Sequence, residues 1–467
     1  MITFPPPLTR RDTLKTAACG FGSLALAGLM ARPAGAAESP GGIVNPFAPR
    51  QPHFPARAKR VIFLFMNGGP SQVDSFDWKP ELSKRHGEDL GGGRKYFQSP
   101  WPFSRHGRSG LPISSLFPHI AAHADDLCLI NSMHTDVGNH PQAILQLNTG
   151  SFQFVRPSVG SWVVYGLGTE NRNLPAYVVL GDPLGLPHNG TRNWTSGFLP
   201  PTFQGTTLRP TGSPILNLKP QFEQPSAVTE AARGLLERLD GIHRQERPHQ
   251  PDLDARIESY GLAARMQLSA SEALDLSREN PHTLESYGIG EKTTDSYGRR
   301  CLLARRLVER GVRFVQLFLE EQPWDSHVDL ADNHRAVCER TDKPVAGLLR
   351  DLKQRGLLEN TLVIWGGEFG RTPTSQKTGD LFTGRDHNMQ AFSSWMAGGG
   401  VKGGFSYGQT DEFGHAVVED PVSVHDFHAT VLHLLGINHE KLFFPRSGLE
   451  ERLTGIEPPR VVTELLA

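Results

Sequence analysis

Four side chains with oxygen donors each follow, within a few residues, an apolar run that predicts a buried strand. They are Asn67, Asp136, Asp325 and Glu368. In an open α/β sheet the carboxyl ends of parallel strands share one edge, where ligand sites form, so residues far apart in sequence should meet there. A single acidic residue after a strand is usually a loop cap or turn former, but four such strand ends together favour a site.

Four histidines accompany these residues in the sequence: His134, His140, His327 and His387. His134 and His140 flank Asp136. His327 lies two residues after Asp325, and side chains two apart on an extended segment point the same way, so this pair can reach a common centre. A donor set of Asn, Asp, Glu and His without thiolate suits Zn²⁺, Mn²⁺, Mg²⁺ or Ca²⁺. A bound dication could polarise an ester oxygen or generate hydroxide near neutral pH.

Arg371 follows Glu368 by three residues and offers a cation next to these donors. Its planar guanidinium could bind a sulfate or phosphate group through two parallel hydrogen bonds. Alternatively, it could form an ion pair with Glu368. The sequence leaves both alternatives open.

Six apolar runs predict the buried strands that position these residues, at 59–66, 127–133, 174–180, 312–319, 361–366 and 392–397. Helical patterns alternate with them, at 141–148, 226–278, 295–310, 333–355 and 422–435. This alternation predicts one α/β layer structure with a mainly parallel sheet. The stretch 181–219 is rich in Gly, Pro, Thr and Asn and predicts a long loop over one face.

Composition and charge exclude several classes of protein. The 467 residues hold 48 Lys and Arg against 49 Asp and Glu, and this balance argues against nucleic-acid binding, which needs a basic face. The 49 Gly and 36 Pro exceed the typical combined usage of about 12%, which excludes a helical bundle. Four Cys are too few for a disulfide scaffold of this length.

The first 36 residues read as a targeting segment. Arg10 and Arg11 precede an apolar stretch at 17–30, and Ala34-Gly35-Ala36 offers small residues to a signal peptidase. The stretch is too short and too rich in Gly and Ala for a stable membrane span. This order resembles a twin-arginine signal and predicts a periplasmic or extracellular protein. We expect a signal peptide at 1–36, a Pro-rich linker at 37–58 and a single domain at 59–467.

Five motifs in order resemble one family. They read RPSVGSWVVYGLGTENRNLPAYVVL, WDSHVD, WGGEFGRTP, GRDHN and HDFHATVLHLLGI. These segments resemble the sulfatase-like family catalogued as domain of unknown function 1501, in the alkaline phosphatase superfamily, over roughly residues 59–453. The resemblance implies a doubly wound, mainly parallel sheet flanked by helices, with metal ligands at the strand ends. A twin-arginine signal at the N-terminus is common in that family, which agrees with the first 36 residues.

The resemblance carries over to individual metal positions. Asp325 and His327 look like the acid–His pair of a first metal, although the usual spacing is wider, and His387 resembles a late His ligand. Asn67 and Glu368 stand where the superfamily usually has metal-binding Asp residues. We therefore expect the first three to hold one divalent metal, and the other two to line a second, weaker subsite.

The catalytic positions match the superfamily only loosely. The segment HPQAILQLNTG aligns with a sulfatase signature that starts at the nucleophile, and here His140 takes that place. No formylglycine precursor of the form Cys-x-Pro-x-Arg occurs in the chain. We expect His134, Asp136 and His140 on the substrate side, with His140 as general acid or base and Arg371 binding the substrate.

Three functions agree with these observations. The first is an exported metal-dependent hydrolase of phosphate or sulfate esters, with polysaccharide as one possible carrier of the ester, and with metal-activated water, Thr135 or Ser71 as nucleophile. The second is a catalytically silent sulfatase-like protein that binds an anionic glycan or a cell-surface partner, which the change to Asn67 supports. The third is an exported redox protein, for which no haem, cluster or flavin motif is present.

Overall fold

The computed structural model describes residues 47–209, 215, 225–247, 250–378, 381–455 and 459–467. All of these residues belong to one compact unit, Pro46–Ala467. The predicted signal peptide and the first part of the predicted linker lie outside the described residues. Within the described residues, no helix combines the length and the apolar character needed to cross a membrane.

A nine-stranded sheet forms the centre of the fold, in the order β13-β5-β12-β9-β1-β8-β6-β7, with β16 also paired to β5. Its strands are β1 (Arg60–Phe65), β5 (Leu127–His134), β6 (Tyr177–Leu180), β7 (Thr206–Leu208), β8 (Phe314–Phe318), β9 (Thr361–Gly366), β12 (Phe392–Ala397), β13 (Phe405–Tyr407) and β16 (Val422–Ser423). Each of the six predicted strands is therefore present.

Strand direction determines which side chains can meet. β1 runs parallel to β8 and β9, and β6 runs parallel to β7 and β8. Only β12 is antiparallel to its two neighbours, β5 and β9, so β5 runs in the same direction as β9. The mainly parallel sheet predicted from the sequence is thus confirmed. The carboxyl ends of β1, β5, β8 and β9 lie at one edge.

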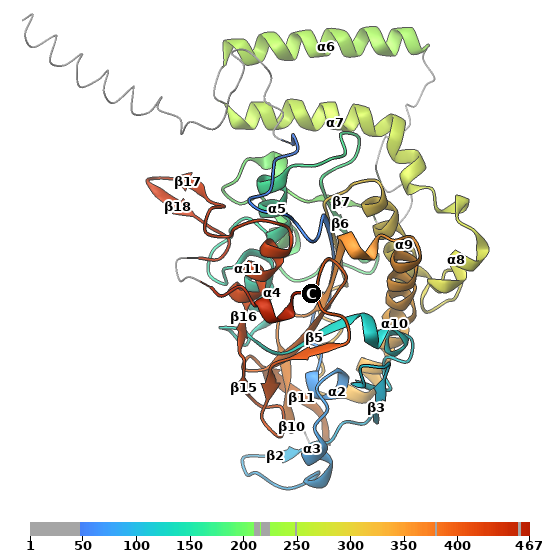
Figure 1. The fold of residues 1–467 in the computed structure, drawn as a ribbon, viewed down its shortest axis with the longest axis vertical. Coiled ribbons are helices and arrows are strands. Elements are labelled where there is room, and N and C mark those ends of the chain that lie inside the picture. The colour runs from blue at the N-terminus through green and yellow to red at the C-terminus, as the bar shows by residue number, and fades with distance from the viewer. Residues whose placement is uncertain (1–46, 210–214, 216–224, 248–249, 379–380, 456–458) are drawn as a thin grey trace, which may run out of the picture. The chain divides into compact units, whose positions relative to one another are not determined.

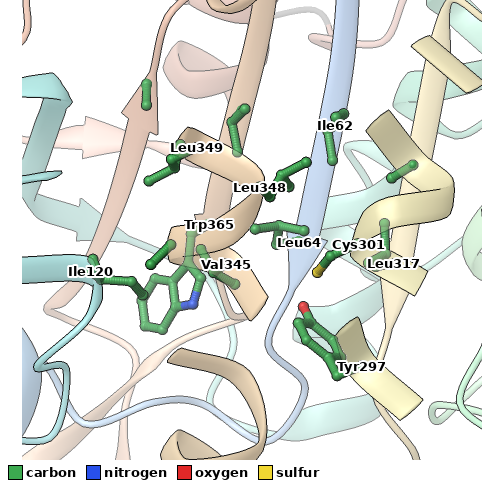
Figure 2. Close-up of a cluster of buried hydrophobic side chains, with 14 of the residues drawn as sticks. Ile62, Leu64, Ile120, Tyr297, Cys301, Leu317, Val345, Leu348, Leu349 and Trp365 are labelled. Atoms are coloured by element: carbon green, nitrogen blue, oxygen red, sulfur yellow. The ribbon is translucent and has the colours of Figure 1, made fainter. Parts of the chain in front are cut away.

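Helices cover both faces of this sheet. In Figure 1, α9 (Asp295–Glu309) and α10 (Leu330–Gln354) lie to one side of it, and α4 (His140–Thr149), α5 (Val159–Leu167) and α11 (Val424–Leu434) to the other. Alternate residues of β1 enter the two cores, because successive side chains of a strand point to opposite faces. Ile62 and Leu64 pack in the core of α9 and α10, as Figure 2 shows with Leu348 and Leu349. Val61 and Phe63 pack in the opposite core.

Local sequence signals explain where the covering helices begin and end. The Asn139 side chain accepts a hydrogen bond from the backbone N–H of Gln142 at the start of α4, and Gly150 closes that helix with φ of 72°. Ser423 and Asp426 form a reciprocal capping box at the start of α11. The predicted helix at 226–278 is divided into α6 (Ser226–Glu246) and α7 (Pro251–Leu274), because a proline favours the first turn of a new helix.

The structure contains short regular elements within the predicted loop at 181–219. Residues 206–208 form β7, which extends the sheet beside β6 and uses backbone groups that would otherwise be unpaired at its edge. Short 3-10 helices also occur there, η2 (Gly190–Trp194) and η3 (Pro201–Phe203). Residues 210–214 and 216–219 lie outside the described part of the chain.

A second, three-stranded sheet was absent from the sequence prediction. It consists of β2 (Arg94–Tyr96), β10 (Gly370–Thr378) and β11 (Leu381–Asn388), in the order β11-β10-β2. The other described helices and strands are α2 (Gln72–Ser75), α3 (Pro80–Lys84), β3 (Phe103–His106), β4 (Leu111–Ser114), η1 (Ile120–Asp126), η4 (Leu276–Arg278), α8 (Pro281–Ser286), η5 (Leu358–Asn360), β14 (Gln409–Thr410), β15 (Val417–Glu419), β17 (Phe444–Arg446), β18 (Leu449–Glu451) and η6 (Thr463–Leu465).

Candidate metal centre

The turn after β1 forms the floor of the candidate centre. Gly68 has φ of +105°, and a Cβ atom there would lie 2.7 Å from the backbone nitrogens of Trp324 and Asp325. Real Cβ atoms do not approach so closely, so only glycine lets the segment after β8 pack against this turn. The turn and Asp325 are thereby brought into contact across 257 residues of sequence.

Asn67 is held at this turn by its amide nitrogen. Nδ2 donates hydrogen bonds to the carbonyl oxygens of Leu319, at 2.7 Å, and Glu321, at 3.1 Å. An aspartate could not donate these bonds, so the amide of Asn67 ties this turn to the segment after β8. The Oδ1 atom of Asn67 is buried and accepts no hydrogen bond from any described residue.

His140, at the start of α4, lies between two carboxylates. Its Nδ1 atom is 2.6 Å from Oε1 of the fully buried Glu368, which also accepts a hydrogen bond from the backbone N–H of Gly68. Its Nε2 atom is 3.4 Å from Oδ2 of Asp325. Burial alone would lower the pKa of His140, but the hydrogen bonds to Asp325 and Glu368 outweigh burial and raise the pKa. If Nδ1 carries the proton, Nε2 presents its lone pair to Asp325.

His387 and His327 approach the same carboxylate from β11 and from the loop after β8. Oδ1 of Asp325 is 3.3 Å from Nε2 of His327 and 3.6 Å from Nε2 of His387. The two Nε2 atoms are 3.0 Å apart. Nδ1 of His387 lies 2.7 Å from the carbonyl oxygen of Gly138, which fixes the proton on Nδ1 and leaves Nε2 with a lone pair. Burial lowers the pKa of His327.

These separations fit a tetrahedral cation site. Nitrogen and oxygen ligands about 2.0–2.1 Å from a zinc ion lie about 3.3–3.4 Å from one another in a tetrahedron. Two overlapping groups can supply such donors, one of His140, Asp325 and His387, and one of His327, Asp386 and His387. Two buried oxygens at this edge, Oδ1 of Asn67 and Oε2 of Glu368, have no hydrogen-bond partner among the described residues. Buried polar atoms rarely stay unpaired, so a cation is a good partner for them.

Arg371 lies inside the protein, behind Asp325. Its side chain is 0% exposed, and Nη1 is 2.8 Å from Oδ1 of Asp325. Its other nitrogens donate to the carbonyl oxygens of Gly68 and Gly69. The ion pair left open by the sequence is therefore with Asp325, rather than with Glu368. Burial raises the pKa of Asp325, but its hydrogen bonds with His140 and His387 and the charge of Arg371 outweigh burial and hold that pKa well below its usual range.

The small sheet brings His387 to the centre. The backbone N–H of Arg385 donates to the carbonyl oxygen of Ser326 at 2.9 Å, and a Cβ at Gly384 would lie 2.0 Å from the carbonyl of His327. Arg385 is itself fully buried in a two-contact ion pair with Asp74, at 2.7 and 3.1 Å. β11 therefore packs closely against the loop that carries Asp325 and His327.

Several predicted residues are not joined to this cluster. No hydrogen bond or ion pair links His134 or Asp136 to it within the described part of the chain. Asp136 is exposed, and its carboxylate instead accepts a hydrogen bond from Gln146 on α4. The two hydroxyls considered as nucleophiles are buried and already donate hydrogen bonds, Thr135 to Gln146 and Ser71 to Asp74.

Two further residues of the centre were given no role by the sequence analysis. Asp386 lies 3.7 Å from Nδ1 of His327, with 45% of its side chain exposed. Phe369 packs against the rings of His140 and His387, with centroid distances of 4.7 and 4.6 Å. The sequence motif containing Asp386 and His387 was visible, but its position on β11 was not, because that hairpin lacks an apolar run.

Comparison with known proteins identifies the family. The model described as "Protein of unknown function (DUF1501)" matches residues 58–466, so the chain belongs to this family, as its motifs predicted. No curated protein matched the sequence.

Three solved structures illustrate the similarity of fold. The PsFucS1 sulfatase from Pseudoalteromonas sp. is 13% identical, with 88% of this chain and 72% of that chain covered and a TM-score of 0.37. The lipoteichoic acid synthase LtaP from Listeria monocytogenes is 10% identical, with 88% and 80% covered and a TM-score of 0.35. The phosphonate monoester hydrolase SpPMH from Silicibacter pomeroyi is 10% identical, with 87% and 76% covered and a TM-score of 0.34. At TM-scores below 0.5, these similarities carry no argument about activity or substrate.

Proposed function

We propose that this member of the DUF1501 family is a metal-dependent hydrolase of phosphate or sulfate esters. The observation that carries the proposal is the convergence of three imidazoles on one carboxylate. Nε2 atoms of His140, His327 and His387 lie 3.3–3.6 Å from the oxygens of Asp325. The Nδ1 protons of His140 and His387 are directed to Glu368 and to the Gly138 carbonyl, so their Nε2 lone pairs face the Asp325 carboxylate unless a cation or an added proton lies between them.

His140, Asp325 and His387 are the residues that would hold the metal. They form the more buried of the two groups, and two of them have their outer nitrogens fixed, by Glu368 and by the Gly138 carbonyl. A divalent cation bound there would polarise an ester oxygen and offset the charge that develops on it during hydrolysis. Oδ1 of Asn67 and Oε2 of Glu368 are the donors left for a second, weaker subsite.

His327 and Asp386 then take the role of a proton-transfer pair at the mouth of the centre. The side chain of His327 is 38% exposed and that of Asp386 is 45% exposed, whereas His140 is only 6% exposed. A general acid or base must come within hydrogen-bond reach of a substrate, and the two exposed groups meet this condition better. This assignment exchanges the roles that the sequence suggested for His140 and His327.

The proposal also includes a class of substrate and a location outside the cytoplasm. An ester of sulfate or phosphate is the substrate class, with an anionic polysaccharide as one carrier. The twin-arginine pattern at Arg10 and Arg11 supports export to the periplasm or beyond. Replacement of both arginines by Lys should leave the precursor in the cytoplasm. Unchanged periplasmic yield would contradict the export proposal.

The hydrolase proposal is tested by metal analysis and by a screen of aryl phosphate and aryl sulfate esters, with and without a chelator. His140→Ala should lose both metal and activity. His327→Ala should keep the metal and lose activity. His134→Ala is the matched control and should keep both.

Two outcomes of this experiment would contradict parts of the proposal. Loss of metal in the His327→Ala chain would return His327 to the ligand set. Absence of metal from the wild-type chain, even when it is supplied in excess, would leave the silent, glycan-binding alternative in place of the hydrolase.

A further inference from the structure

A second concave site lies at the same sheet edge, beyond β6 and β7. It is a cavity of about 650 Å³. Five leucines supply its apolar lining: Leu180, Leu208, Leu274, Leu276 and Leu303. Small-molecule sites are typically concave, mostly apolar and about 300–1,000 Å³ in volume. Ligands of open α/β sheets also bind beyond the carboxyl ends of the strands, which is where this cavity lies.

The charged groups of this cavity are paired with one exception. Arg299 pairs with Asp295 at 2.8 Å, and Arg300 pairs with the buried Asp182 at 2.5 Å. The carboxylate of Asp275 accepts hydrogen bonds from the backbone and hydroxyl of Ser277 and lies 3.5 Å from Nε of Arg278. These groups therefore have little charge left for a ligand.

Arg209 is the exception. It lines the cavity directly after β7, is exposed, and makes no hydrogen bond or ion pair with any residue that the structure describes. A guanidinium presents a planar fork of donors that matches a carboxylate or another small oxyanion. The cavity thus combines an apolar wall with a single uncompensated cation.

We propose that this cavity binds a small amphiphilic monoanion, with the anionic head on Arg209 and the apolar body against the leucines. The site is separate from the candidate metal centre, since none of the proposed metal ligands lines it. Its ligand therefore need not be a substrate. The proposal does not depend on hydrolase activity.

Isothermal titration of the wild-type chain with decanoate tests the proposal, with decanol and decyltrimethylammonium as uncharged and cationic analogues of equal chain length. We expect saturable binding of decanoate that is at least tenfold tighter than binding of either analogue. Arg209→Gln should weaken decanoate binding at least tenfold and leave decanol binding unchanged. Arg192→Gln, which removes another exposed arginine in η2, is the matched control and should bind decanoate like the wild type.

A cavity-filling variant separates the apolar part of the site from the charge. Leu276→Trp should weaken the binding of decanoate and decanol together. Absence of decanoate binding in the wild type, equal affinity in the Arg209→Gln chain, or equal affinity for the cationic analogue would each overturn the proposal. Unfolding of the Arg209→Gln chain is not expected, because the Arg209 side chain is exposed and forms no hydrogen bond or ion pair with the described residues.

Discussion

The central sheet and the small β2-β10-β11 sheet both supply residues to the candidate metal centre, but different interactions hold them in place. β1 lies between two helical layers, and residues 61–65 are buried among apolar side chains on both faces. β11 is instead anchored by the fully buried ion pair of Arg385 with Asp74. Its partner strand β10 carries Arg371, whose donors reach the turn after β1. Apolar packing thus positions the strands that lead to Asp325 and Glu368, whereas buried charge positions β11 and His387.

This difference has an energetic consequence. Apolar packing is spread over many contacts, so a single conservative change in the central sheet costs only a part of its stability. A buried ion pair depends on both partners, because removal of one leaves an uncompensated charge in the interior. The small sheet should therefore be the more fragile support, and the ligands from the two sheets should respond differently to substitution.

The largest effect is expected at Asp325, where both sheets meet. Asp325→Asn keeps the shape of the side chain but removes the charge that faces three imidazoles and Arg371. Changes in outer-shell partners typically cost 10–100-fold in metal affinity, so loss of this direct ligand should cost more than about 100-fold. Metal content after dialysis measures the effect, and Asp136→Asn is the control. Full metal occupancy in the Asp325→Asn chain would show that the ligand assignment is wrong.

The next effect concerns the support of the small sheet. Arg385→Met leaves Asp74 buried without its partner and should lower the free energy of unfolding by about 3–5 kcal/mol. Urea denaturation measures this change. The double variant Asp74→Leu with Arg385→Met removes both charges and should recover part of the loss. If the double variant is no more stable than the single one, the anchoring of β11 by charge is not supported.

Low pH should lower the free energy of unfolding through protonation of His334, which contacts the turn after β1 and the loop after β8. This ring accepts a hydrogen bond from the backbone N–H of Ser71 and contacts the Ser326 hydroxyl, and burial lowers its pKa to about 3. The unfolded chain, with a His pKa of about 6.5, binds the proton more readily, so stability falls as the pH drops below about 6.5. Between about pH 6.5 and pH 5 the free energy of unfolding should fall by roughly 1.6 kcal/mol.

Urea titrations at several pH values test this dependence. His334→Gln removes the titrating group and should flatten the slope below about pH 6.5, although it lowers stability at neutral pH. His86→Gln is the control, since that ring is exposed in part and lies outside this support. An identical slope in the wild-type and His334→Gln chains would assign the acid sensitivity to another group.

The smallest effect is expected at Glu368, which acts on the centre through His140. Glu368→Gln keeps the size of the side chain but removes the anion that orients the imidazole. Metal affinity should fall roughly tenfold, or about 1.4 kcal/mol. Competition with a chromogenic chelator measures it. A loss as large as that of Asp325→Asn would instead indicate that Glu368 binds the same metal as Asp325 directly.

The same contrast explains how far the sequence could predict the structure. The strands of the central sheet are apolar runs, and strand-end geometry alone brought Asp325 and His327 to one centre with Glu368 nearby. The β10-β11 hairpin contains buried arginines in place of an apolar run, and the partner of Arg385 is 311 residues away. Asp136 shows the limit of the strand-end argument, because its carboxylate turns to Gln146 rather than to the cluster.

Titration with Co²⁺ tests the central claim most directly, because its visible absorption distinguishes tetrahedral from octahedral coordination. A single tight centre made of His140, Asp325 and His387 predicts that the intense visible bands of a tetrahedral site saturate at one Co²⁺ per chain, before the weaker second subsite fills. His387→Ala, which removes the ligand from the small sheet, should abolish these bands, and His134→Ala should preserve them. Absence of saturable Co²⁺ binding by the wild-type chain, or unchanged bands in the His387→Ala chain, would contradict the account.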